Sequence, residues 1–467
     1  MPPETTHYDA LIIGTGQAGP SLAAKLTQAG FRTAIVEKDR PGGTCVNTGC
    51  TPTKTLVASA YVAHQMRHAA EYGLVWKGEL TVDWAAFQAR QRKVVAASRD
   101  GLDRWLSHME KLTFLRGEAK FLSPYQVVIN QQKYSADKFY LNVGGRAHVP
   151  PIPGLAQVAY YTNQNILDIP DLPRHLVILG GSYIGLEFGQ IFRRFGCEVT
   201  IIERGARLVE REDPAASEEI RRVLEAEGIT ILCQESVVAI EKDDAIEKND
   251  AAQSVVLASG QRISGDALLV AIGRRPNTDK LGLPEANVAT DPRGYIEVNE
   301  ELRTSQSHIW ALGDCNGRGA FTHTSYNDYE IVAENLLENA GRKVSDRIPC
   351  YSLFTDPPLA RVGLNRQQAA QRGLAFRVGH RPMTRVSRAV EKGETSGFLE
   401  VLVDAHSDAI LGATILGVGG DEAIHCIATA MYAGLTARQF RRSVHIHPTV
   451  AELLPTVLGE LQDPAQA

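Results

Sequence analysis

Two stretches of the chain, residues 8–38 and 174–204, repeat one pattern of apolar and polar positions. In each stretch an apolar run ends at a glycine, a helix-like segment follows, and a second apolar run ends at a glutamate. This pattern predicts a strand, a helix and a second parallel strand, the βαβ unit. Gly14 is matched by Gly180, and the same offset of 166 residues holds at the other marked positions. The chain is therefore expected to contain one kind of nucleotide-binding unit twice.

The glycines of the first stretch follow the order Gly14-x-Gly16-x-x-Gly19, which is a dinucleotide fingerprint. Gly14 permits a tight turn, Gly16 lets the backbone approach a pyrophosphate, and Gly19 lets helix and strand pack closely. The start of the helix presents free N–H groups to the phosphates. Glu37, at the end of the second apolar run, can accept hydrogen bonds from a ribose. One isolated fingerprint is a weak signal, because small residues also open helices for packing alone.

In the second stretch the corresponding positions are Gly180, Ser182 and Gly185, with Glu203 at the end of the second run. Ser182 replaces the middle glycine, and its small side chain still permits close approach. Two copies in register predict two bound dinucleotides. The class of protein that needs two is an oxidoreductase that passes a hydride from one to the other with a flavin as relay.

Other apolar runs predict strands that end beside these nucleotides. Residues 308–314 predict a strand that ends at Asp314, whose carboxylate either closes a turn or binds ribityl hydroxyls of a flavin. Residues 268–277 predict a strand that ends at Gly273, where the backbone can approach a nucleotide. Residues 114–122 predict a strand or a turn beside the first nucleotide.

Composition and charge exclude several classes of protein. The 467 residues are 44% hydrophobic and 22% charged, as in a soluble globular protein, and the length suggests roughly three domains. The 49 basic and 54 acidic residues give a net charge of -5, so nucleic acid and anionic membranes are not expected partners. No apolar run is long enough to span a bilayer, and the first residues do not resemble a signal peptide. The expected location is the cytoplasm.

The stretch GGTCVNTGCTPTK holds two cysteines, Cys45 and Cys50, the only close pair among seven. A structural zinc site needs a second close Cys or His pair at ligand spacing. The one close histidine pair, His445 and His447, has a proline directly after it and no cysteine nearby, so no metal site is predicted. A disulfide in the cytosol is more often catalytic than structural. The pair is therefore expected to be a redox couple.

The chain resembles the pyridine nucleotide–disulfide oxidoreductases, such as glutathione reductase, dihydrolipoamide dehydrogenase and mercuric reductase, along nearly its whole length. The matching motifs, in the family's order, are GTGQAG, GGTCVNTGCTPTK, GGSYIGLE, AIGRRPN, ALGD, FTDPPLARVG and HPTVAE. The resemblance implies an α/β fold with two Rossmann-like dinucleotide-binding domains, the NAD(P) domain inserted in the FAD domain, plus a C-terminal α+β dimerisation domain. The implied limits are residues 1–155 and 276–345 for the FAD domain, 156–275 for the NAD(P) domain and 346–467 for the dimerisation domain. The implied assembly is a homodimer whose active site is shared across the interface.

The resemblance also implies the roles of individual residues. Cys50 matches the thiol beside the flavin, and Cys45 matches the thiol that attacks the substrate. Lys54 and Glu187 match an ion pair beside the flavin, and Tyr183 matches an aromatic gate that moves when the nicotinamide enters. The expected FAD contacts are Gly14, Gly16, Gly19, Glu37, Gly43, Thr44, Lys54, Ala119 and Asp314, and the expected NAD(P) contacts are Gly180, Ser182, Tyr183, Gly185, Glu203 and Gly273.

His447 and Glu452 match the family's acid–base dyad, which reaches the cysteines of the partner subunit. From the residues alone, Glu452 equally completes a T-x-x-E capping box at the start of a helix. His445 is an alternative to His447 for the same role. Without their motifs, Lys54 is an ordinary solvated lysine and Tyr183 an ordinary packed aromatic residue.

The thiol chemistry can also be argued from the residues. Thr51-Pro52, directly after Cys50, is typical of the first turn of a helix. A thiol there lies in the positive field of the helix end and tends toward the thiolate, and Lys54 adds a cation one turn later. Cys45 lies on the preceding loop and is better placed to reach outward. Thiol–disulfide exchange also needs a proton source for the leaving thiol, a role that suits histidine.

The electron acceptor stays open at this point. The cysteine motif is closest to that of mercuric reductases, but the C-terminus lacks their second cysteine pair, no metal-binding module precedes the first strand, and His447 stands where they carry tyrosine. The stretch LNVGG departs from the Ala-Thr-Gly that is usual in the family. We expect a small-molecule disulfide as acceptor, with a mercuric or cupric ion or dihydrolipoamide dehydrogenase activity as alternatives, and a flavin redox sensor without turnover as the last choice.

The choice of nicotinamide coenzyme rests on Glu203. A carboxylate at this position favours NADH, because it repels the 2′-phosphate of NADPH. Arg204 and Arg207 follow closely and could still accept that phosphate. The sequence therefore predicts FAD together with NADH or NADPH, with NADH favoured.

Overall fold

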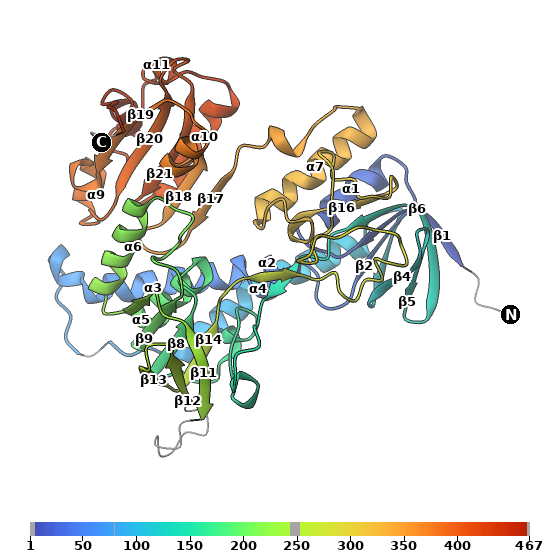
Figure 1. Cartoon of the computed structure of the whole chain (residues 1–467), viewed down its shortest axis with the longest axis horizontal. Helices are drawn as coiled ribbons and strands as arrows, with labels where there is room; N and C mark the ends of the chain where they lie inside the picture. Colours follow the sequence, from blue (N-terminus) through green and yellow to red (C-terminus); the bar gives the residue numbers. More distant parts are fainter. Residues whose placement is uncertain (1–4, 79, 243–252, 465–467) are drawn as a thin grey trace.

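The computed structural model describes residues 5–78, 80–242 and 253–464. Figure 1 shows three groups of elements: one around the N-terminal sheet at the right, one around a second sheet at the lower left, and one formed by the C-terminal strands at the upper left. Each group has an apolar core of its own, although the core around the second sheet also takes in residues of the long N-terminal helices and of the C-terminal strands.

The first sheet contains seven strands in the order β3-β2-β1-β6-β5-β4, with β16 also paired to β6. The pairs within β3-β2-β1-β6 and the pair β6–β16 are parallel, whereas β4, β5 and β6 pair antiparallel. The strands are β1 (Thr6–Ile13), β2 (Thr33–Glu37), β3 (Leu112–Arg116), β4 (Ala119–Ser123), β5 (Gln126–Ile129), β6 (Gln132–Leu141) and β16 (Ile309–Ala311).

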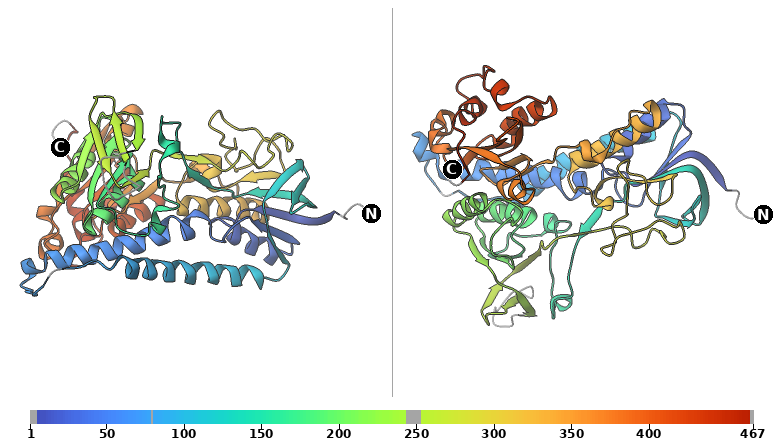
Figure 2. Two further views of the ribbon diagram at one scale, coloured as in Figure 1. Left: turned by 90° about the horizontal axis from the view of Figure 1, so that it is seen from below. Right: turned by 45° about the horizontal axis from the view of Figure 1, so that its top comes forward.

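Helices pack beside this sheet and extend from it toward the second sheet. The first helix of the βαβ unit, α1, packs against α7, and the long helix α3 packs against both α4 and α5. Figure 2 shows α3 and α4 running side by side along the molecule. The helices of this unit are α1 (Gly19–Gln28), α2 (Gly43–Asn47), α3 (Cys50–Arg67), α4 (Trp84–Ser107) and α7 (Thr322–Glu338). Helix α5 (Tyr183–Arg194) belongs to the second unit and packs against β8 and β9.

The second sheet is parallel and has the order β10-β9-β8-β14. Strands β8, β9 and β14 are largely buried, as expected for a parallel sheet covered on both faces, whereas the edge strand β10 is partly exposed. An antiparallel sheet, β11-β12-β13, lies next to it. The elements are β8 (His175–Leu179), β9 (Glu198–Glu203), β10 (Thr230–Cys233), β11 (Val237–Lys242), β12 (Gln253–Leu257), β13 (Arg262–Gly265), β14 (Ala267–Val270) and α6 (Pro214–Ala226).

The second unit is inserted into the first. After β6 the chain leaves the first sheet through β7 (Gly145–Ala147), and after β14 it returns through β15 (Arg274–Pro276) to reach β16. Strands β7 and β15 pair antiparallel, so the two crossings lie side by side. The arrangement agrees with the predicted fold class, whereas the predicted residue limits of the domains stay predictions.

The C-terminal unit is an antiparallel sheet in the order β17-β18-β21-β20-β19, which packs against α10. Strand β20 is buried along nearly its whole length. The elements are β17 (Cys350–Leu353), β18 (Leu359–Gly363), α8 (Arg366–Gln371), β19 (Phe376–Pro382), α9 (Ser387–Glu391), β20 (Phe398–Asp404), β21 (Ile410–Leu416), α10 (Gly420–Tyr432), α11 (Ala437–Phe440) and α12 (Leu454–Val457). Single 3-10 turns span Ala69–Tyr72, Leu155–Gln157, Ile166–Asp168, Gly313–Asn316, Val344–Asp346, Met383–Arg385 and Ala451–Leu453.

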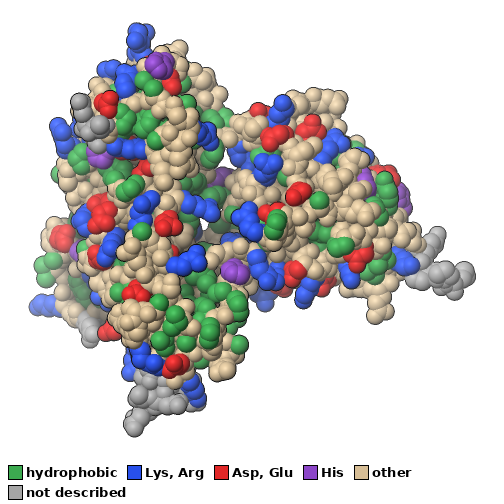
Figure 3. Space-filling view, in the orientation of Figure 1, with side chains coloured by type: hydrophobic (Ala, Val, Ile, Leu, Met, Phe, Trp, Pro, Cys, Tyr) green, Lys and Arg blue, Asp and Glu red, His purple; other side chains and the backbone are tan. Residues whose placement is uncertain are grey.

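The strands predicted outside the two repeats exist but are shorter than expected. The strand expected to reach Gly273 ends at Val270, and a separate strand begins at Arg274. Gly273 itself has a φ of +124°, outside the strand region. The segment 114–122 forms the end of β3 and the start of β4, with a turn between them. Within the described residues no helix is long and apolar enough to cross a membrane. Figure 3 shows acidic and basic side chains mixed over one face of the molecule.

Candidate functional site

The first glycine turn follows β1 and has no room for side chains. Gly14 has a φ of +104°, and a Cβ there would lie 2.3 Å from the carbonyl oxygen of Asn142. A Cβ on Gly19 would lie 2.4 Å from the carbonyl oxygen of Gly14, so helix α1 can start this close to β1 only with glycine. At the end of β2, Glu37 accepts hydrogen bonds from the backbone N–H and the hydroxyl of Thr15. The turn and the carboxylate thus lie beside each other, as a dinucleotide site requires.

The thiol-bearing loop begins directly against this turn. A Cβ on Gly43 would lie 3.1 Å from the Cα of Gly16, so α2, which also contains Thr44, starts in contact with the glycine turn. A Cβ on Gly16 itself would lie 2.6 Å from Oδ1 of Asn142. This backbone turn, which has no side chains and lies next to the Glu37 carboxylate, fits the adenosine and pyrophosphate parts of FAD.

The second turn repeats this geometry after β8. Gly180 has a φ of +110°, and a Cβ there would lie 2.5 Å from the carbonyl oxygen of Ala271. A Cβ on Gly185 would lie 2.0 Å from the carbonyl oxygen of Gly180. Ser182 is the N-cap residue of α5, but its side chain makes no capping hydrogen bond. The hydroxyl that replaces the middle glycine is therefore not used to cap the helix.

The carboxylate of Glu203 is held at the end of β9 by backbone groups. One oxygen accepts a hydrogen bond from the N–H of Gly181 and the other from the N–H of Gly205, each at 2.6 Å. Arg204 is exposed, and the guanidinium of Arg207 donates to the carbonyl of Glu210. The acidic group is thus fixed next to the second turn, and one of the two arginines is already engaged with the backbone.

Three other predicted contact residues lie at separate places in the fold. Asp314, in the turn after β16, is half-buried and 3.2 Å from the guanidinium of Arg274. Gly273 lies just before that arginine, and nothing lies within 4 Å of the place where its Cβ would be. Ala119 is buried in the core of the first sheet, so only its backbone could touch a nucleotide.

The thiol pair lies at the junction of α2 and α3. Cys45 lies in α2 and not on the predicted loop, and Cys50 is the first residue of α3; both are free thiols. The prediction that Cys45 reaches outward is not met in the single chain, because Cys45 is half-buried and Cys50 is exposed. A hydrogen bond from Cys45 lowers the pKa of Cys50 to about 6, and the Thr322 hydroxyl and the Lys54 ammonium act in the same direction. The bond to Cys50 and burial raise the pKa of Cys45 far above its ordinary value. In the reduced pair, Cys50 is therefore the thiolate and Cys45 the thiol.

One turn into α3, Lys54 forms an ion pair with Glu187 of helix α5. The ammonium and the carboxylate are 2.7 Å apart, and the Glu187 side chain is only 7% exposed. The other carboxylate oxygen accepts from the N–H of Phe354, and the ammonium lies 4.7 Å from the centre of the Phe354 ring. The structure therefore brings together two residues that the sequence reasoning paired by resemblance alone.

His447 and Glu452 also lie together. Nδ1 of His447 is 3.0 Å from each carboxylate oxygen of Glu452. Only half of the alternative capping box forms: the N–H of Glu452 donates to the hydroxyl of Thr449, while its carboxylate turns to the histidine. His445 instead packs against Phe440, with ring centres 5.4 Å apart. The geometry therefore favours His447 over His445 as the histidine of a dyad.

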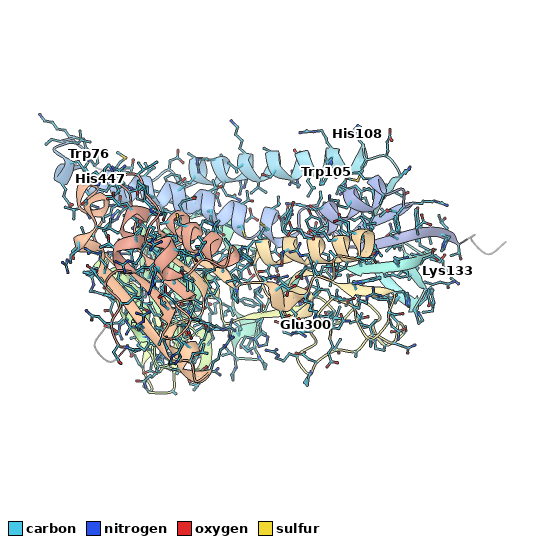
Figure 4. All side chains as sticks on the ribbon, turned by 90° about the horizontal axis from the view of Figure 1, so that it is seen from above. Trp76, Trp105, His108, Lys133, Glu300 and His447 are labelled. Carbon is cyan, nitrogen blue, oxygen red and sulfur yellow. The ribbon has the colours of Figure 1, made fainter. Side chains whose placement is uncertain are left out.

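The histidine of the dyad is exposed at one end of the molecule (Figure 4). Figure 4 shows His447 at the end of the molecule opposite to Lys133 of the first sheet. Its side chain is 72% exposed, and the neighbouring apolar residues Val444 and Ile446 are 98% and 80% exposed. Within the described part of one chain, His447 makes no hydrogen bond to Cys45 or Cys50.

Sequence reasoning missed two residues of this region. Thr322 starts α7, and its hydroxyl lies 3.3 Å from the sulfur of Cys50. No local pattern indicates that contact, because 272 positions separate the two residues. Asn142 accepts from the N–H of Gly19 and donates to the carbonyl of Leu312, so it ties the first turn to β16. In the sequence, Asn142 belongs to the stretch LNVGG, which departs from the Ala-Thr-Gly that is usual in the family. That departure was the sign by which this residue could have been found.

Comparison with known proteins agrees with this geometry. The family model described as pyridine nucleotide-disulphide oxidoreductase matches residues 8–328, and the dimerisation domain of the same family matches residues 350–458. The chain belongs to the pyridine nucleotide-disulphide oxidoreductases. The resemblance, the fold class and the enzyme class inferred from the sequence are thereby confirmed.

Within this family, the chain is similar to proteins that are named for different reactions. The chain is 34% identical over 456 residues to the probable pyridine nucleotide-disulfide oxidoreductase RclA of Escherichia coli, covering 96% of this chain and 98% of that one. It is 32% identical to mercuric reductase of Lysinibacillus sphaericus, covering 96% of this chain and 81% of that one. It is also 32% identical to dihydrolipoyl dehydrogenase of Chlamydia pneumoniae, with 96% of each chain covered. A solved structure of the Cu(II) complex of the HOCl-induced flavoprotein disulfide reductase RclA matches with a TM-score of 0.88 and 33% identity, over 97% of this chain and 99% of that one.

Membership in the pyridine nucleotide-disulphide oxidoreductases makes the protein an NAD(P)H-dependent flavoprotein that contains FAD. The C-terminal unit is the family's dimerisation domain, which supports a homodimer. The choice between NADH and NADPH, the acceptor and the role of each residue stay predictions.

Proposed function

We propose that electrons pass from NAD(P)H to a Cys45–Cys50 disulfide and from there to a small-molecule disulfide. The proposal rests on Cys50, which starts a helix, contacts the Thr322 hydroxyl at 3.3 Å and has its pKa lowered to about 6. A thiol so arranged is a thiolate near neutral pH, the form that exchanges with disulfides. FAD, when bound, supplies the two-electron relay between the nicotinamide and the thiol pair.

The electrons balance over one reduction and two thiol–disulfide exchanges. Two electrons from NAD(P)H break the Cys45–Cys50 bond and leave Cys50 as the thiolate and Cys45 as the thiol. Cys45, once deprotonated, attacks the acceptor disulfide, forms a mixed disulfide and releases the first product thiol, which takes up a proton. Cys50, as the thiolate, then attacks the sulfur of Cys45, re-forms the internal disulfide and releases the second product as a thiolate, which takes up a proton from solvent.

His447 of the partner subunit is the proposed acid–base group. Glu452 accepts from Nδ1, so Nε2 is left free to take the proton of Cys45 and return it to the leaving thiol. The raised pKa of Cys45 makes such a base necessary. The exposed side chains of His447, Val444 and Ile446 support a site that is completed only when a second copy docks.

For the nucleotide we propose NADH. The Glu203 carboxylate, fixed by the N–H groups of Gly181 and Gly205, would repel a 2′-phosphate. The test compares kcat/KM for NADH and NADPH in the holoenzyme. A higher kcat/KM for NADPH would contradict the proposal.

The thiol assignment is tested with Cys45→Ser and Cys50→Ser variants, with Cys233→Ser as a control for a half-buried thiol in the second unit. Both site variants should bind FAD and still oxidise NADH with an artificial electron acceptor, while turnover of a disulfide is lost. The control should turn over like the unchanged protein. Disulfide turnover by Cys50→Ser would refute the assignment.

A soft metal ion is the second candidate acceptor. Thiolates bind soft metals, and the relatives include mercuric reductases and a flavoprotein disulfide reductase whose structure holds Cu(II). A panel of NADH and NADPH against lipoamide, glutathione disulfide, coenzyme A disulfide, mercuric ion and cupric ion separates the candidates. Steady consumption of coenzyme with any acceptor would also exclude a sensor without turnover. We propose the cytoplasm as the location, because it keeps such thiols reduced.

A further inference from the structure

A buried carboxylate lies between the second nucleotide-binding unit and the C-terminal sheet. Glu212 precedes helix α6 and has no exposed surface. Its Oε2 lies 2.7 Å from a guanidinium nitrogen of Arg361 on β18, and that arginine is only 1% exposed. A buried charge of this kind is tolerated only with its partner, so Glu212 and Arg361 form one unit.

The other oxygen of Glu212 accepts hydrogen bonds from two tyrosines. Oε1 lies 3.1 Å from the hydroxyl of Tyr183 and 2.8 Å from the hydroxyl of Tyr351. Burial raises the pKa of both phenols, so both stay protonated and both donate. The two hydroxyls therefore share one carboxylate oxygen.

The ring of Tyr183 lies between the second glycine turn and the thiols. Tyr183 is the first residue of α5, directly after the turn. Its ring meets the edge of Phe321 at 6.2 Å and 87°, and Phe321 stacks on Tyr351 at 5.4 Å and 7°. Phe321 immediately precedes Thr322, whose hydroxyl contacts Cys50. A nicotinamide that extends from the turn toward the thiol side would meet this ring.

We propose that Glu212 is a positioning residue that anchors Tyr183 in the closed position, and that Tyr351 weakens this anchor by sharing the same oxygen. The proposal rests on the function proposed above. When the ring of Tyr183 moves away, Glu212 keeps Arg361 and Tyr351 as partners. Opening therefore breaks one hydrogen bond without leaving a buried charge unpaired.

The test measures the affinity of the holoenzyme for NAD+ and for ADP-ribose by titration calorimetry. ADP-ribose lacks the nicotinamide and does not require the ring to move, so it reports on the rest of the site and on correct folding. Tyr183→Phe keeps the ring but removes the anchor, and should tighten NAD+ binding about fivefold relative to ADP-ribose. Tyr351→Phe leaves Tyr183 as the only tyrosine on that oxygen, and should weaken NAD+ binding about twofold relative to ADP-ribose.

Tyr140→Phe is the matched control, because Tyr140 is buried and its hydroxyl has no hydrogen-bond partner in the described part of the chain. It should leave both affinities unchanged. The proposal is overturned if Tyr183→Phe and Tyr351→Phe shift the ratio of the two affinities in the same direction, or leave it unchanged. A failure of the proposed function would look different, since the unchanged protein would then not turn over a disulfide with either coenzyme.

Discussion

The Thr322 hydroxyl is predicted to be one of the groups that keep Cys50 ionised near neutral pH. It lies 3.3 Å from the sulfur, and when Cys50 is a thiolate the hydroxyl must be the donor. Thr322→Val removes that donor and preserves the shape of the side chain. A hydrogen bond to a charged group contributes about 1.5 kcal/mol, which corresponds to a change of roughly one in the pKa. The pKa of Cys50 should therefore rise from about 6 to about 7.

The assay is the pH dependence of alkylation of the reduced protein by iodoacetamide, with peptide mass spectrometry to separate Cys50 from Cys45. Because the thiolate is the reactive form, the Cys50 rate near pH 6 should fall about fivefold in Thr322→Val. Thr322→Ser keeps the donor and should keep the inflection near 6. The reasoning is refuted if Thr322→Val leaves the inflection of Cys50 where it was, or if Thr322→Ser moves it as far as valine does.

Three further outcomes are expected. His447→Gln should leave reduction of the flavin by NADH unchanged in stopped-flow measurements but lower kcat for disulfides about a hundredfold or more, since acid–base catalysis is lost; equal losses in both half-reactions would argue against the dyad. Gly185→Ala places a Cβ 2.0 Å from the carbonyl of Gly180, so the melting temperature or the NAD+ affinity should fall, whereas Gly101→Ala in α4, whose Cβ meets nothing within 4 Å, should lower neither. Lys54→Met leaves the 7%-exposed Glu187 side chain without its cation, which should lower the free energy of unfolding by about 3 kcal/mol. A denaturant titration that gives the same free energy of unfolding for the variant and the unchanged protein would contradict this.

Local patterns in the sequence predicted the parts of the site that depend on neighbouring residues. The glycine turns at Gly14 and Gly180 require positive φ angles, and a constant offset of 166 marked both. The start of α3 at Cys50 was visible because Thr51-Pro52 is typical of a first helical turn. In these cases the local structure is determined by residues a few positions apart. The spacing of those residues along the sequence was therefore enough to predict it.

Contacts between distant segments left no such spacing. The Thr322–Cys50 contact spans 272 positions, and the Glu212–Arg361 pair spans 149. Residues of these types are also common at protein surfaces. Their contacts therefore became known only from the way the three units pack against one another. The low pKa of Cys50 was expected from its place at a helix start and from Lys54, but the contributions of Cys45 and Thr322 depend on the folded arrangement.

The central claim is that Cys45 and Cys50 carry the electrons. Its most direct test is anaerobic addition of one equivalent of NADH to the oxidised holoenzyme, followed by alkylation and peptide mass spectrometry. The account predicts that Cys45 and Cys50, unreactive before the addition, both become alkylated while the labelling of the other five cysteines does not change. A flavin that is reduced while Cys45 and Cys50 stay bonded to each other would contradict the account.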